Sequence, residues 1–220
     1  MSSTVITEQL IEALREKVKP YLSANRYKHV LGVEREAETL GRIFLPDSVN
    51  LLRTAALLHD ITKKLTPEEH IALASELGVA FSEEELLSPK LFHANTGAEL
   101  AKRDFPEYAE PSVISAIRLH TTGHPDMNMF ESIIYLADYI EDTRTFDDCI
   151  ELRKFFYDNI EKASGNDEKY RVFVMTMIKS FDMTIRCLVE ENGLIDRNTV
   201  EARNRFLTEL KNGGINERIG

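Results

Sequence analysis

The residues most suited to chemistry in this chain are histidines and aspartates placed inside apolar helical segments. His59 and Asp60 follow directly on the apolar run Ala55 to Leu58. Three more histidines and one more aspartate lie in similar stripes of apolar or small residues, namely His29, His93, His120 and Asp138. Burying a lone polar group is costly unless it finds a partner. Together, the six residues predict a buried metal site.

The types of donor atom limit which metals fit such a site. Imidazole and carboxylate together suit iron, manganese, cobalt or zinc, and no cysteine lies near these positions to form a thiolate zinc site. Adjacent residues on a helix point about 100° apart, so His59 and Asp60 can share one site only near a helix end or between their two directions. This favours Asp60 as a bridging ligand, with each oxygen contacting one of two ions.

The predicted reaction is hydrolysis of a phosphoester or phosphoanhydride. Two ions about 3.5–4 Å apart can activate water for attack on phosphorus and stabilise charge on the attacking and leaving oxygens. Four cations close to the ligands in sequence could neutralise a polyphosphate, and these are Arg26, Lys63, Arg118 and Arg144. The residue pattern alone stops at metal-assisted phosphohydrolysis.

Helical periodicity dominates the segments that must position these side chains. His29 shares a face with Val33 and Ala37, and His59 falls on the apolar side of a helix that begins near Pro46. The other candidates lie in three further expected helices. His93 lies in a helix that begins at Ser88-Pro89, and His120 lies in one that begins at Pro111. Asp138 lies in the helix that follows the loop 121–125.

Several other helices are indicated by their ends. Capping boxes at Thr66 and Ser82 predict two short helices, and the first should stop at Gly78. Two late helices are expected over about 167–191 and 198–210. No window alternates convincingly with period two, so we predict an all-α fold.

Composition excludes several classes of protein. The chain has 220 residues, 43% hydrophobic and 29% charged, so it can bury a sizeable core as one globular domain. A formal net charge of −10 gives no basic field for nucleic acid or an anionic membrane. Cys149 and Cys187 are expected to be free, helix-packing thiols in a reducing compartment. Residues 1–8 resemble no secretion signal and no apolar stretch is long enough to span a bilayer, which predicts a cytoplasmic protein.

The ordered set of six candidate ligands resembles the HD superfamily of metal-dependent phosphohydrolases. More narrowly, five motifs between about Leu10 and Leu188 are similar to the YqeK-type branch: RYKHVLGV at 26–33, AALLHDITK at 55–63, HANTGA at 93–98, HTTG at 120–123 and ADYIE at 137–141. The resemblance implies a single helical-bundle HD domain over residues 1–195. Residues 196–220 would then form a C-terminal helical extension packed on the same domain.

The YqeK-type branch implies symmetrical hydrolysis of bis(5′-nucleosyl) tetraphosphates, chiefly diadenosine tetraphosphate to two ADP, at a site with one or two iron ions. ADP or GDP is expected as product or analogue. The firmly bound ion is expected on His29, His59, Asp60 and Asp138, while a second metal position or a direct phosphate contact is expected at His93 and His120. Other substrate contacts are expected from Arg26, Lys63, Thr121 and Arg144. The expected catalytic group is Asp60, Lys63, His93 and His120.

Some alternatives stay open from the sequence. Another HD phosphohydrolase would act on guanosine alarmones, a dNTP or a nucleoside monophosphate, and a non-catalytic sensor would bind ADP or GDP in the same pocket. An alternative interpretation of Lys63 is a solvated cation at the end of a helix, where the helix dipole favours positive charge. His70 is expected at the solvated surface, and His124 is left out of the ligand set. The helix near 181–186 is a candidate wall of the nucleotide pocket, and a homodimer is left open.

Overall fold

The computed structural model describes residues 5–213, which form helices and turns without any strand, so the all-α prediction is confirmed. In chain order the α-helices are α1 (Glu8–Val18), α2 (Ala24–Phe44), α3 (Val49–Leu58), α4 (Pro67–Leu77), α5 (Glu83–Leu86), α6 (Phe92–Asp104), α7 (Pro111–Leu119), α8 (Met129–Ile140), α9 (Asp147–Ile160), α10 (Asn166–Glu190) and α11 (Arg197–Lys211). Short 3-10 turns precede α3 at Pro46–Ser48 and α6 at Pro89–Leu91. The last residues of the expected extension, 214–220, lie outside the described residues.

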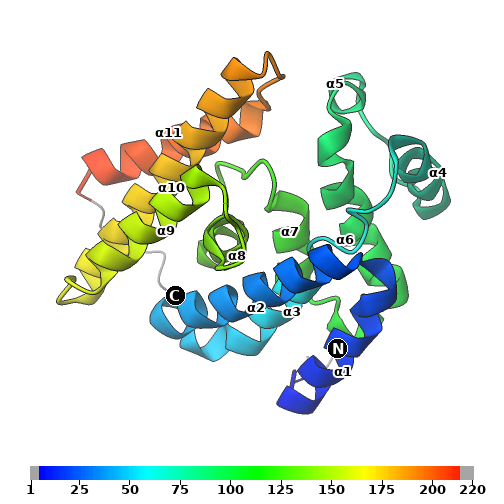
Figure 1. Ribbon diagram of the computed structural model, residues 1–220, viewed down its shortest axis with the longest axis horizontal. Helices are drawn as coiled ribbons and strands as arrows, with labels where there is room; N and C mark the ends of the chain where they lie inside the picture. Colours follow the sequence, from blue (N-terminus) through cyan, green and yellow to red (C-terminus); the bar gives the residue numbers. More distant parts are fainter. Residues whose placement is uncertain (1–4, 214–220) are drawn as a thin grey trace.

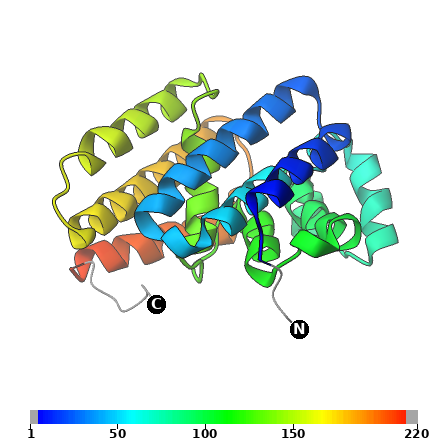
Figure 2. The same ribbon diagram turned by 90° about the horizontal axis from the view of Figure 1, so that it is seen from below.

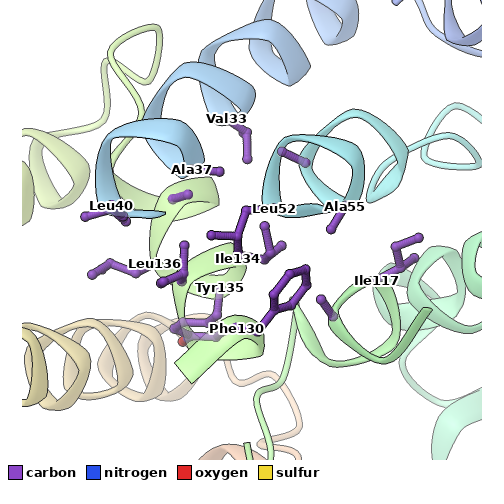
Figure 3. Close-up of a cluster of buried hydrophobic side chains, with 14 of the residues drawn as sticks. Val33, Ala37, Leu40, Leu52, Ala55, Ile117, Phe130, Ile134, Tyr135 and Leu136 are labelled. Carbon is purple, nitrogen blue, oxygen red and sulfur yellow. The ribbon is translucent and has the colours of Figure 1, made fainter. Parts of the chain in front are cut away.

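Helix α8 is the centre of the structure, and it packs against α2, α3, α7, α9 and α10 (Figure 1). Its sequence explains this position, since buried residues surround the helix rather than forming one stripe. Side chains of α8 such as Ile134 and Leu136 meet Val33 from α2, Leu52 from α3 and Ile117 from α7 in one cluster (Figure 3). The core therefore holds together the helices on which the candidate ligands lie.

Two groups of helices flank this centre. Helices α9, α10 and α11 lie side by side, with α10 in contact with both neighbours (Figure 2). At the other end of the molecule α4 packs on α6, and α6 packs on α7. Ala202 and Phe206 of α11 are fully buried against the body of the protein. The division into residues 1–195 and 196–220 remains a prediction.

Helix boundaries follow the local signals closely, while one helix was not predicted and the position of one cysteine was predicted wrongly. The capping boxes at Thr66 and Ser82 both form, and α4 ends at Gly78 with φ of 70°. The sequence analysis did not delineate α9, although its buried residues recur at helical spacing from Cys149 to Ile160. The prediction that both cysteines pack between helices is wrong for Cys187, which is exposed on α10.

No helix among residues 5–213 is both long enough and apolar enough to cross a lipid bilayer.

Candidate active site

The candidate ligands lie at points where the helices give them fixed directions. His59 and His120 are the C-cap residues of α3 and α7, and His93 lies in the first turn of α6. His29 projects from the buried side of α2, and Asp138 lies in the last turn of α8. Five helices that the core packs together thus bring these side chains to one place.

Asp60, in the turn after α3, lies between two groups of histidines. Its Oδ2 is 3.5 Å from Nε2 of His59 and 3.8 Å from Nε2 of His29. Its Oδ1 is 3.4 Å from Nε2 of His93 and 3.7 Å from Nε2 of His120. The two carboxylate oxygens face different pairs of nitrogens, which is the geometry that a bridging carboxylate needs.

Asp138 completes the group around His29 and His59. Its Oδ1 is 3.0 Å from Nε2 of His29 and 3.8 Å from Nε2 of His59. One ligand atom from each of these three residues lies within 4.8 Å of the others, and the same holds for His59, Asp60 and His120. These distances are short enough for a single small cation to contact all members of a group.

All four histidines point the same ring nitrogen inward. Nδ1 of His59, His93 and His120 lies 2.6–2.9 Å from the backbone carbonyl oxygen of the residue three positions earlier. Nδ1 of His29 lies 3.0 Å from Oε1 of Glu141. Carbonyl and carboxylate oxygens only accept hydrogen bonds, so Nδ1 carries a proton in all four rings, and Nε2 is the nitrogen that would meet a bound metal ion. Neutral imidazole in this form is a metal ligand.

A further observation shows that the residues present suit a metal ion. Within residues 5–213, two buried side-chain nitrogen atoms make no hydrogen bond of good geometry: Nε2 of His59, and Nε2 of His29, whose nearest acceptor is the ion-pair contact with Asp138 at 3.0 Å. Buried polar atoms nearly always have a partner. Two such atoms beside two carboxylates indicate a place for a cation.

Electrostatics keeps the carboxylates ionised. Burial raises the pKa of Asp60, but the surrounding histidines lower it more strongly, so the pKa lies well below its usual range. The pKa of Asp138 is likewise low, because Arg144 and His29 outweigh burial. Burial lowers the pKa of His29, yet the neighbouring carboxylates of Asp138 and Glu141 outweigh burial and raise it to about 9. The carboxylates that favour a proton on His29 also favour a metal cation.

Cations and hydroxyls surround a cavity of about 250 Å³ next to these ligands. Arg26 Nη1 is 2.8 Å from Asp60 Oδ2, and Arg144 Nη2 is 2.5 Å from Asp138 Oδ1. Lys63 Nζ is 3.0 Å from Nε2 of His93. Arg26, Arg144 and Lys63 therefore carry positive charge into the cavity of an otherwise acidic protein.

Thr121 belongs to the same cavity, whereas one predicted cation does not. The Thr121 hydroxyl lies 3.2 Å from Nε2 of His93 and 3.1 Å from Nε2 of His120. Arg118 does not line the cavity and pairs instead with Glu99 at the surface, because the last turn of α7 points it away from the ligands.

Sequence reasoning missed several residues of the site. Tyr135, Tyr139 and Thr184 also line the cavity, and Thr184 lies in the helical segment expected to form a wall. Glu141, fully buried beside His29, was given no role. The signal was its spacing, since Glu141 follows Asp138 by about one helical turn.

The prediction of a solvated His70 is wrong, while His124 stays outside the ligand group. His70 is 4% exposed and its Nδ1 lies 2.9 Å from the hydroxyl of Thr96. Helix α4 turns this face toward α6, and Ala74, one turn later, is buried with it. His124 lies near Asp126 in the loop and does not line the cavity.

Comparison with known proteins agrees with this geometry. The family model of the HD domain matches residues 26–143. The chain belongs to the HD domain family. The matched segment contains all six candidate ligands.

Individual relatives are similar over most of their length. The chain is 32% identical over 196 residues to the symmetrical bis(5′-nucleosyl)-tetraphosphatase of Halalkalibacterium halodurans, covering 88% of this chain and 95% of that protein. It is 36% identical over 148 residues to the protein of the same name from Bacillus subtilis, covering 66% and 77% respectively. A crystal structure of a "predicted HD superfamily hydrolase involved in NAD metabolism" from Clostridium acetobutylicum has a TM-score of 0.75 at 32% identity, covering 90% of this chain and 97% of that one.

Proposed function

We propose that the protein is a metal-dependent hydrolase that cleaves diadenosine tetraphosphate and related dinucleoside tetraphosphates symmetrically into two nucleoside diphosphates. The single observation that carries the proposal is the cluster of four histidines and two aspartates, with His93 joined to it through Asp60, beside a cation-lined cavity. The names of the relatives add the substrate, since the residues alone support only phosphohydrolysis.

The metal ligands would divide into two groups that share Asp60. His29, His59, Asp138 and one oxygen of Asp60 would hold one ion, and His93, His120 and the other oxygen of Asp60 would hold a second. When bound, such ions would activate water and polarise a phosphoryl oxygen. We propose iron as the resident metal, and imidazole with carboxylate also suits manganese, cobalt or zinc.

The chain's own residues would position the polyphosphate and balance its charge. Arg26, Arg144 and Lys63 lie around the cavity, where each can donate to phosphate oxygens. Thr121 can add a neutral hydrogen bond. In the reaction, water attacks a phosphorus atom of the central anhydride, the bond to the bridging oxygen breaks, and that oxygen leaves with one ADP. The second ADP retains the oxygen from water, and the cations would stabilise the charge on both products.

Space for the rest of the substrate is found beside the cavity. An adjoining pocket of about 470 Å³ shares Lys63, Thr121 and Thr184 with it and extends between Pro89 and Leu188. Its other walls come from residues 87–91 and 188–199. We propose that one nucleoside lies in this pocket while the phosphates lie at the ligands, so the N-terminal end of α11 takes part in binding.

Product analysis tests the reaction. Purified protein supplied with iron or manganese should convert diadenosine tetraphosphate to ADP alone. A mixture of AMP and ATP would contradict symmetrical cleavage. Faster initial rates with guanosine alarmones, a dNTP or a nucleoside monophosphate would favour another HD phosphohydrolase, and tight ADP binding without turnover would favour a sensor.

The remaining expectations belong to the same proposal. We propose a cytoplasmic protein that acts on small nucleotides and has no nucleic-acid or membrane partner, in keeping with its net charge of −10. Elemental analysis of the protein as purified would identify the metal, and sedimentation would show whether it forms a homodimer.

A further inference from the structure

His29 differs from the other three inward-facing histidines in how its ring is held. His59 and His120 close their helices, where the last carbonyl groups are free of helical partners, and each ring hydrogen-bonds to such a carbonyl. His29 lies inside the 21-residue helix α2, where the preceding carbonyls are occupied by the helix itself. Its Nδ1 therefore needs a partner from elsewhere in the fold.

Glu141 supplies that partner from the end of α8. Its Oε1 is 3.0 Å from His29 Nδ1, and its side chain is fully buried. Thr143 fixes the carboxylate, since its backbone N–H donates to Oε2 at 2.6 Å and its hydroxyl donates to Oε1 at 2.7 Å. With Asp138 3.0 Å from Nε2, the imidazole lies between two carboxylates one turn apart on α8.

Gly32 leaves the space that the Glu141 carboxylate occupies. A Cβ added to Gly32 would lie 2.0 Å from Glu141 Oε2 and 2.9 Å from its carboxyl carbon. Gly32 lies one turn after His29 inside α2, where glycine is unfavourable compared with alanine. Glycine at position 32 is thus explained by the space that the Glu141 carboxylate needs, and not by the preference of the helix.

We propose that Glu141 is a positioning residue that fixes the ring and tautomer of His29 for metal binding, and that Gly32 is required because it admits this carboxylate. The inference rests on the metal site of the proposed function. A carboxylate only accepts hydrogen bonds, so Glu141 would keep a proton on Nδ1, and in the metal-loaded protein Nε2 would be the nitrogen that gives up its proton and binds the ion. Glutamine at 141 could also donate, and would therefore no longer impose one tautomer.

Zinc affinity provides a test that does not depend on catalysis. Competition with a chromophoric chelator should show 10- to 100-fold weaker Zn²⁺ binding in Glu141→Gln than in the unchanged protein, the range typical of lost partners of metal-bound histidines. Asp142→Asn is the matched control, because it removes an adjacent carboxylate that pairs with Arg35 at the surface. It should bind Zn²⁺ like the unchanged protein.

A double-mutant cycle tests the role of Gly32. Gly32→Ala should weaken Zn²⁺ binding in the unchanged protein but have no further effect in a Glu141→Ala background, where the carboxylate it would displace is gone. Gly41→Ala is its control on the same helix, since that Cβ would crowd the Leu52 side chain at 2.7 Å. It should change thermal stability but not Zn²⁺ affinity.

Nitrogen-15 NMR of histidine-labelled, Zn²⁺-loaded protein reads the tautomer directly. His29 should be protonated at Nδ1 in the unchanged protein and should lose this single state in Glu141→Gln. Unchanged Zn²⁺ affinity and tautomer in folded Glu141→Gln, or equal effects of Gly32→Ala in both backgrounds, would overturn the inference alone. If Glu141→Gln does not fold, the Zn²⁺ affinity of folded Gly32→Ala alone decides, and an affinity equal to that of the unchanged protein would overturn the inference. Failure of the unchanged protein to bind Zn²⁺ would overturn both the metal site and the inference.

Discussion

At the residue scale, Asp60 is the side chain on which both groups of histidines converge. Asp60→Asn keeps the shape but removes the charge that balances two cations. We expect turnover to fall by roughly 10³-fold or more and metal content to drop, with helicity unchanged. Elemental analysis, steady-state kinetics and circular dichroism would measure these effects. Asp126→Asn, in an exposed loop nearby, should behave as the unchanged protein, and full activity in Asp60→Asn would contradict a bridging role.

Lys63 and Lys64 form a natural pair for testing a phosphate contact. Lys63 is partly buried next to His93 and lines the cavity, whereas Lys64 is exposed and donates to the carbonyl of Pro20. Lys63→Met should lower kcat/KM for diadenosine tetraphosphate by roughly 10²-fold, since it removes a charge-assisted contact. Lys64→Met should have little effect. Equal effects of the two substitutions would show that Lys63 acts only through the net charge of the protein and not through a contact with the phosphate.

Prediction from sequence worked best for residues whose type is unusual in its surroundings. A histidine such as His59 inside an apolar stripe is conspicuous, and the six candidate ligands do lie together. Glu141 and His70 were not recognised, because glutamate and histidine beside other polar residues look like surface positions. Their burial depends on which helix packs over them, and this information is not local.

At the element scale, α9 supports the site without contributing a residue to its cavity. Arg153 from α9 donates to the carbonyl groups of Ile140 and Arg144 at 2.6 Å and 2.9 Å. The first contact occupies a carbonyl left free at the end of α8, the second lies in the turn that follows, and together they hold the segment that carries Glu141. Sequence reasoning passed over α9 because it contains no candidate ligand, although its apolar residues have helical spacing.

Glu36 makes the contact between α2 and α9 sensitive to pH. Burial raises its pKa to about 7, although the Tyr157 hydroxyl donates to it at 2.6 Å and lowers the pKa in part. The folded protein thus binds this proton more tightly than the unfolded chain does. Its contribution to the free energy of unfolding is greatest below pH 4.5 and is lost as the pH rises through about 7, by about 3 kcal/mol at most.

Glu36→Gln should remove this part of the pH dependence, because the amide oxygen can still accept from Tyr157 without ionising. Urea denaturation between pH 5 and 8 should show a smaller loss of stability with rising pH in the variant. Glu16→Gln, at an exposed position paired with Lys19, is the control. Parallel pH profiles for Glu36→Gln and the unchanged protein would contradict the prediction.

The pocket between Pro89 and Leu188 predicts a separation of binding from chemistry. Leu188→Trp would fill part of this pocket while leaving every candidate ligand in place. We expect KM for diadenosine tetraphosphate to rise about tenfold, with kcat and metal content nearly unchanged. Val189→Trp is the control, since Val189 is exposed and does not line the pocket. An unchanged KM in Leu188→Trp would place the nucleoside elsewhere.

At the scale of the whole molecule, metal binding should be coupled to stability. The ligands come from five helices, so the unfolded chain cannot hold them together. At a metal concentration about 1,000 times Kd, binding adds about 4 kcal/mol to the free energy of unfolding, which corresponds to roughly 10 °C in Tm for a chain of this size. Scanning calorimetry with a chelator, and after restoring manganese, should show a loss and a recovery of this size. An identical Tm in both states would contradict coupling.

The all-α class could be predicted because it depends on local periodicity and helix caps. The arrangement of helices around α8 could not, because the same apolar stripes allow several packings. At the site, motif similarity supplied the missing information, because the order of the ligands along the chain matched a family in which these residues lie close together. It did not help for the segments after Leu188, which no recognised motif covers.

The contact between α2 and α8 also specifies a small transferable unit. His-x-x-Gly on one helix faces Asp-x-x-Glu on its neighbour, so four residues define a ligand, its charge partner, its orienting acceptor and the gap that admits this acceptor. A designer of artificial metalloproteins could graft this quartet onto a two-helix interface without borrowing the rest of the fold.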